Sequence, residues 1–104
     1  MNKLVQYEKD FEKKFMDKAK YIPNSYWLDK EAPSSVRGTP DRIGLINGRF
    51  VALEFKRSSK EMGHPREHLQ KYVLSNVLKA GGYGMFVYPE NAHMVLETLR
   101  GMNK

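Results

Sequence analysis

The sequence contains no cysteine, so it has neither disulfide bonds nor a zinc site built on thiolate ligands. It also lacks a long apolar run, and this excludes a membrane-spanning helix. The N-terminal residues are rich in charge where a signal peptide has an apolar centre, so we expect a cytoplasmic protein. No repeat or low-complexity tract divides the 104 residues, and we expect them to form a single domain.

What the chain does have is an excess of basic residues, with 18 lysines and arginines against 12 acidic residues and a formal net charge of +6. A basic protein is attracted to polyanions, because neutralising phosphates releases their counterions. The basic residues are spread along the chain and form no continuous arm. The charge is therefore compatible with nucleic-acid binding, but it does not indicate which residues would bind.

The hydrophobic pattern alternates between helical and strand periods along the chain. We expect helices at residues 3–20, 65–80 and 90–100, and strands at residues 26–28, 42–46, 49–55 and 85–88. A helix between the last two strands favours a right-handed crossover, which would make the last strand parallel to a neighbour. The expected fold class is α/β, with a small mixed β-sheet flanked by helices.

The dipeptide Asn47-Gly48 is typical of a tight type I′ hairpin turn. Counting back from this turn places Asp41 directly opposite Glu54 on one face of the hairpin. Lys56 lies two residues beyond Glu54 and shares that face. Two carboxylates and an ammonium group are therefore predicted to converge at the open end of the hairpin.

Opposed like charges repel, so the acid pair needs an explanation. One explanation is a solvated pair at an exposed edge, with Lys56 as its salt-bridge partner. However, Glu54 lies within the apolar run 51–55, where an uncompensated acid is costly. A divalent cation with oxygen ligands would supply the missing charge, so we favour a metal site. Glu8 and Glu12 both fall on the apolar side of the first helix, and either could reach that site.

The residues Gly38-Thr39-Pro40-Asp41, followed by Glu54-Phe55-Lys56, resemble the signature of the PD-(D/E)XK nuclease superfamily. Their setting, GTPDRIGLINGRFVALEFKR with Gln70 and then KAGGYGMFVYP, resembles the VRR-NUC family. The chain is most similar to the small stand-alone members from phages and bacteria, from about Glu12 to Leu99. The resemblance implies a restriction-endonuclease-like αβββαβ core.

The resemblance also implies a role for each matching residue. It implies that Asp41 and Glu54 bind Mg²⁺ or Mn²⁺, together with the backbone carbonyl of Phe55. It implies that Lys56 positions or activates the attacking water, with Gln70 beside it.

The first-helix acid and the DNA contacts complete the expected site. Glu12 matches the family's first-helix acid better than Glu8 does. Four basic residues flank the predicted site and are candidate phosphate contacts, namely Arg37, Arg42, Arg57 and Lys60.

The implied activity is metal-dependent endonucleolytic hydrolysis of DNA. Stand-alone members of the family resemble Holliday-junction resolvases that act as homodimers, so we expect branched DNA as substrate and a homodimer as the assembly. Two alternatives remain open. The chain could be a non-catalytic DNA-binding module with the nuclease fold, or a restriction-like nuclease that reads a short sequence, although it has no recognisable base-reading element.

Other residues have simpler expected roles. His64 and His68 have the spacing of zinc ligands, but we expect them on the surface. The aromatic pair Tyr26-Trp27 and the methionines Met85 and Met94 are expected in the core.

Overall fold

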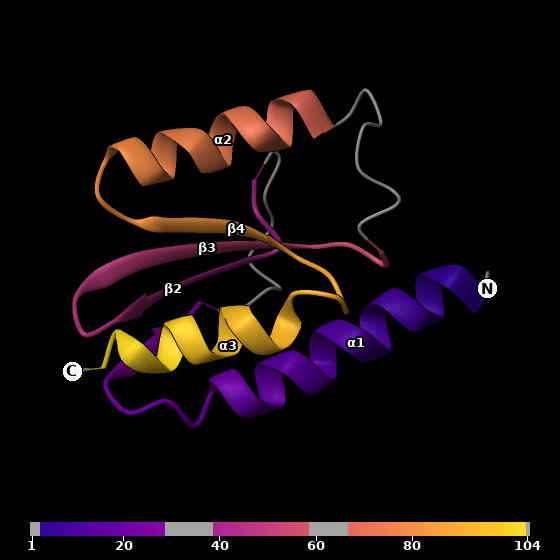
Figure 1. The fold of residues 1–104 in the computed structure, drawn as a ribbon, viewed down its shortest axis with the longest axis horizontal. Coiled ribbons are helices and arrows are strands. Elements are labelled where there is room, and N and C mark those ends of the chain that lie inside the picture. The colour runs from indigo at the N-terminus through magenta and orange to yellow at the C-terminus, as the bar shows by residue number, and fades with distance from the viewer. Residues whose placement is uncertain (1–2, 29–38, 59–66, 104) are drawn as a thin grey trace.

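The computed structural model describes residues 3–28, 39–58 and 67–103. Within these ranges the chain forms three helices and a four-stranded sheet (Figure 1). In chain order the elements are α1 (Lys3–Ala19), β1 (Ser25–Trp27), β2 (Arg42–Ile46), β3 (Arg49–Phe55), α2 (Glu67–Lys79), β4 (Tyr83–Val87) and α3 (Ala92–Gly101). No helix in these ranges is long and apolar enough to cross a membrane.

The strands follow the order β1-β2-β3-β4, and the sheet is mixed. The pairs β1–β2 and β2–β3 are antiparallel, whereas β3 and β4 are parallel and are connected through α2. Helix α2 covers one face of the sheet, and α1 and α3 cover the other (Figure 1). The predicted α/β class, the mixed sheet with flanking helices and the parallel last strand are confirmed.

The hairpin forms with the predicted register. Asn47 and Gly48 have φ values of 51° and 80°, the positive values that a type I′ turn requires. Ile46 pairs with Arg49, and Arg42 pairs with Leu53. Extending this register by one residue on each strand places Asp41 opposite Glu54.

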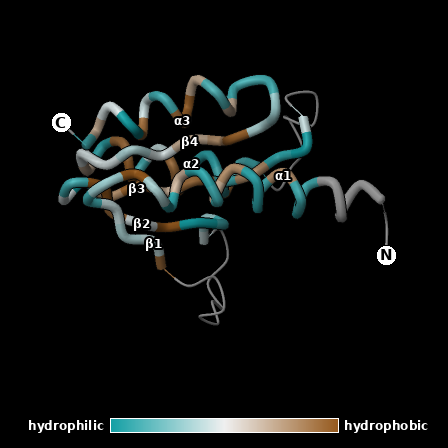
Figure 2. Tube along the Cα trace, turned by 90° about the horizontal axis from the view of Figure 1, so that it is seen from below, coloured by the Kyte–Doolittle hydropathy of each residue, from teal (hydrophilic) through white to brown (hydrophobic). Residues whose placement is uncertain are grey.

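The hydrophobic core lies between the sheet and the α1–α3 layer. Phe55 is central to it, and the rings of Phe11 and Phe15 meet the Phe55 ring edge-on at centroid distances of 5.9 and 5.4 Å. Apolar residues of β3, β4 and α3 complete this core. The helices alternate between hydrophilic and hydrophobic segments along the chain, as layers that cover a sheet do (Figure 2).

Helix α2 packs closely on its side of the sheet, because two glycines line the contact. A Cβ atom at Gly84 would lie 2.8 Å from the carbonyl oxygen of Leu74, and one at Gly82 would lie 2.9 Å from Val77 Cγ1. Gly81, with φ 94°, turns the chain out of the helix. Gly82 and Gly84 therefore allow the short distance between α2 and the strands β3 and β4.

Several boundaries and burials differ from the sequence expectations. Strand β4 begins two residues before its predicted start, because pairing with β3 already begins where Val51 meets Tyr83. Tyr26 and Met94 are 64% and 52% exposed, so their predicted place in the core is wrong. Tyr26 lies on the short edge strand β1, and Met94 lies outside the stripe of α3 that faces the core. Trp27 and Met85 pack against the core as expected.

Candidate active site

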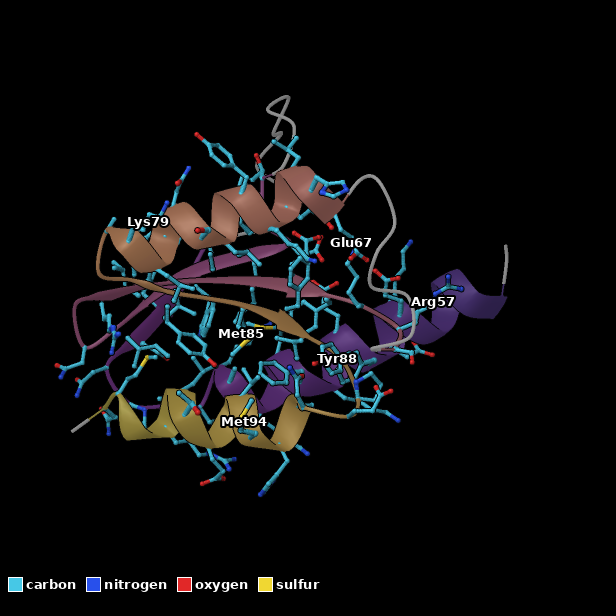
Figure 3. The ribbon with its side chains drawn as sticks, turned by 45° about the horizontal axis from the view of Figure 1, so that its top comes forward. Arg57, Glu67, Lys79, Met85, Tyr88 and Met94 are labelled. Atoms are coloured by element: carbon cyan, nitrogen blue, oxygen red, sulfur yellow. The ribbon has the colours of Figure 1, made fainter. Side chains whose placement is uncertain are left out.

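Polar side chains from three segments meet near the end of β3. Asp41 immediately precedes β2, Glu54 and Lys56 lie at the end of β3, and Glu67 and Gln70 belong to the first turns of α2. Glu67 marks the start of α2 in Figure 3. Side chains alternate along a strand, so Phe55 points into the core while its two neighbours point toward α2.

Asp41 and Glu54 form the opposed acid pair that the hairpin predicts. Asp41 Oδ2 accepts a hydrogen bond of 2.9 Å from the backbone N–H of Phe55. Glu54 is only 6% exposed and Asp41 is half-buried, so the structure does not place the two acids as a solvated pair at an exposed edge.

The surroundings of Glu54 disfavour its charged form. Burial, followed by the charge of Asp41 and a hydrogen bond with its side chain, raises the pKa of Glu54 from 4.5 to about 9. The charge of Lys56 and a hydrogen bond from the Asp41 backbone oppose this increase in pKa. The site therefore disfavours a second negative charge beside Asp41 in the absence of a further cation.

Gln70 links Glu54 to Lys56. Its Nε2 donates a hydrogen bond of 3.1 Å to Glu54 Oε1, and its Oε1 accepts one of 2.8 Å from Lys56 Nζ. This arrangement fixes which end of the amide faces which group, because only the NH₂ end can donate to a carboxylate. The sequence resemblance placed Gln70 beside this site, and the structure brings it there.

Lys56 is held on several sides. Its backbone N–H donates to the carbonyl of Val87 at 2.8 Å, which ties it to β4. Its Nζ lies 5.7 Å from the centroid of the Phe86 ring and 3.8 Å from Glu67 Oε1. The ammonium group is therefore placed by a carboxylate, an amide and an aromatic ring.

Sequence reasoning missed Glu67, which is 2% exposed. One signal was available, because Glu67 precedes Gln70 by three residues and therefore shares its helix face. Without the orientation of α2 relative to the sheet, however, that face could not be assigned to the site.

Glu12 is buried and forms an ion pair with Arg42, with 2.7 Å between Glu12 Oε2 and Arg42 Nε. Arg42 pairs with Leu53 and so lies on the face of the sheet that α1 covers, opposite to Glu54. The structure thus connects Glu12 to the residue that follows Asp41. A role for Glu12 in metal binding, and one for Arg42 in DNA binding, stay predictions.

The other predicted residues divide into two groups. Arg57 directly follows Lys56 (labelled in Figure 3) and is half-buried, and its predicted contact with DNA stays a prediction. His68 is exposed on α2, as expected. Arg37, Lys60 and His64 lie outside the described residues.

The donor set can be tested against a metal. No three carboxylate, imidazole or thiol side chains in the described parts of the chain form a group that could hold an ion by themselves. Mg²⁺ keeps several waters and commonly uses one or two carboxylates together with phosphate oxygens. The two carboxyl groups of Asp41 and Glu54 fit such a hard cation, which would favour the charged form of Glu54, and they do not fit a closed four-ligand zinc site.

No protein-family model, curated protein or solved structure matches this chain. The geometry of the site and the motif resemblance therefore carry the functional proposal.

Proposed function

We propose that the protein is a metal-dependent endonuclease that hydrolyses phosphodiester bonds in DNA. One observation carries the proposal, namely the buried Glu54 that faces Asp41 and is linked through Gln70 to Lys56. A buried glutamate that faces a half-buried aspartate, with one adjacent lysine, is costly for a purely structural element, but it suits a site that binds a cation and a phosphate.

Asp41, Glu54 and the backbone carbonyl of Phe55 would hold Mg²⁺ or Mn²⁺. When bound, the cation would neutralise charge on the phosphate oxygens and lower the pKa of a water molecule. The N–H of Phe55 orients the Asp41 carboxylate, and Gln70 orients that of Glu54. Both carboxylates are therefore placed before any ligand binds, which reduces the ordering cost of binding.

Lys56 would act on the reacting phosphate. Its ammonium group would offset negative charge as it develops on the phosphate oxygens, and it would position the attacking water. Gln70 accepts a hydrogen bond from this ammonium and so determines where its remaining hydrogens point.

Branched DNA is the proposed substrate, a homodimer the proposed assembly and the cytoplasm of a bacterial or phage-infected cell the proposed location. A net charge of +6 favours binding to phosphates of any DNA. Preference for a four-way junction would then need two active sites at a fixed separation, which a closed two-fold dimer provides.

The decisive experiment incubates the purified protein with labelled junction, flap, nicked and linear DNA, in Mg²⁺, Mn²⁺ or EDTA. We expect cleavage that requires the metal and is fastest on branched DNA. Asp41→Asn and Glu54→Gln should abolish it, whereas Glu97→Gln, a matched loss of an exposed acid, should not. Metal-independent binding without cleavage would favour the non-catalytic module, and cleavage at one short sequence would favour a restriction-like nuclease.

Assembly and substrate preference need a separate measurement. We expect light scattering to give the mass of a dimer, and junctions to bind more tightly than linear duplex of equal length. Both affinities should fall steeply with salt while their ratio persists, since the ratio comes from geometry. A monomer with equal affinity for both DNAs would overturn the resolvase proposal but leave the nuclease proposal intact.

A further inference from the structure

Glu67 combines three properties that its helix does not require. It is 2% exposed, its Oε1 lies 3.8 Å from Lys56 Nζ, and it shares a helix face with Gln70. Glutamate is seldom this deeply buried unless it is paired. Helix α2 therefore presents two groups to one ammonium, an amide oxygen at 2.8 Å and a carboxylate further away.

The position of this carboxylate matters because Lys56 has other negative partners close by. Gln70 bridges Lys56 to Glu54, and Asp41 binds the neighbouring backbone N–H of Phe55, so two further acids lie in the same site as the ammonium. A lysine side chain is long and flexible, and in direct contact with the two acids it would occupy the place of a cation. A carboxylate on α2 opposes that movement.

We propose that Glu67 is a positioning residue that holds Lys56 on the α2 side of the site and thereby leaves Asp41 and Glu54 open to the metal. The inference rests on the proposed nuclease function, because it assigns Glu67 a role in that same site. Phe86 also helps to hold Lys56 on the α2 side, because the centroid of its ring lies 5.7 Å from the Lys56 ammonium group.

A purely structural role is the competing explanation. Glu67 lies in the first turn of α2, where a negative charge stabilises a helix through its dipole. Removing it would then lower stability without any dependence on Lys56. The two roles are separated by a double-mutant cycle, because only residues that act through one another show coupled losses.

The cycle compares the wild type, Glu67→Gln, Lys56→Met and the double variant, with single-turnover cleavage and KM for DNA as readouts. We expect Glu67→Gln to lower the cleavage rate about 10- to 100-fold, as misplacement of a reacting group does, with KM changed less than about threefold. In the Lys56→Met background the same change should have no further effect on the residual rate. Glu97→Gln, an exposed acid on α3, is the matched control and should leave the rate unchanged.

A second variant covers the case in which Glu67→Gln does not fold. Glu67→Asp keeps the charge but shortens the reach, so we expect an intermediate rate and a melting temperature near that of the wild type. Losses that multiply independently in the double variant, or a wild-type rate for a folded Glu67→Gln protein, would overturn the positioning role. A wild type without metal-dependent cleavage would overturn the nuclease proposal itself, which distinguishes the two failures.

Discussion

The two faces of the sheet differ in what they contribute, although they share the same strand. Toward α1 and α3, β3 presents Leu53 and Phe55, which belong to a continuous apolar core. Toward α2, the same segment presents Glu54 and Lys56, which contact polar groups. Because side chains alternate along a strand, one face of this segment contributes apolar side chains to the core and the other contributes charged side chains to the candidate site.

This difference indicates that the acids of the α2 face are held in place by the core of the other face. Phe55 is enclosed by aromatic rings while its own N–H orients Asp41. A residue of the core therefore positions a residue of the site through its backbone. Substitutions on the α2 face should change chemistry at little cost in stability, and those on the core face should do the reverse.

The largest effect should come from the acid pair. We expect Asp41→Asn and Glu54→Gln each to reduce cleavage by about 10³-fold or more, because each removes several kcal/mol of charge stabilisation in the transition state. The melting temperature of the metal-free protein should stay level or rise, because Glu54→Gln removes an acid whose charged form burial disfavours and Asp41→Asn removes the charge that faces it. Gel-based cleavage and thermal unfolding measure the two effects. Normal cleavage by either variant would contradict the metal-site assignment.

The core face should give the opposite result. Leu53→Ala removes a fully buried side chain and should lower the free energy of unfolding by about 2–5 kcal/mol. Below its melting temperature the variant should still require metal and should retain most of its cleavage rate. Urea unfolding gives the stability. A stable Leu53→Ala protein without activity would show that the two faces are not separable.

Features of the structure could be predicted from the sequence where they depend on contacts between residues that are close together in the chain. The Asn47-Gly48 turn and the two-residue strand period fix the pairing of Asp41 with Glu54, because both are local. The hairpin bounds were therefore predicted to the residue, and the convergence of the acids with Lys56 is confirmed.

The contributions of the helices could not be predicted in the same way. The rotation of α2 and its height above the sheet depend on Gly82 and Gly84, whose close contacts appear only in three dimensions. Gln70 was placed by its resemblance to a family motif, whereas Glu67 matched no motif and was missed. The ion pair of Glu12 with Arg42 likewise depends on how α1 lies across β2.

The polar contact on the α1 side provides an intermediate test. We expect Glu12→Gln to lower the free energy of unfolding by about 1–3 kcal/mol, because it leaves the half-buried Arg42 without its charged partner. It should also slow cleavage more than Glu8→Gln does, since Arg42 follows Asp41 directly. Parallel unfolding and cleavage assays compare the two variants. If Glu8→Gln is the more damaging change, then Glu8, one helical turn earlier, is the first-helix acid and the assignment to Glu12 is wrong.

The last prediction concerns the pH dependence of the metal-free protein. The surroundings of Glu54, burial first and Asp41 second, raise its pKa from 4.5 to about 9. A group whose pKa is higher in the folded state than in the unfolded state adds stability below its unfolded value, and this contribution is lost as the pH rises through the folded value. We therefore expect the melting temperature to fall progressively between pH 4.5 and about 9.

Two comparisons sharpen this prediction about the α2 face. Saturating Mn²⁺ should flatten the decline in melting temperature, because a cation favours the charged carboxylate, and its binding should release a proton near neutral pH. Glu54→Gln should flatten the decline without metal, whereas Leu53→Ala should lower every melting temperature and leave the slope unchanged. Thermal unfolding across this pH range, with and without Mn²⁺, separates the variants. An undiminished slope in Glu54→Gln would mean that another group produces the pH dependence, and that the charge imbalance lies elsewhere than at the acid pair.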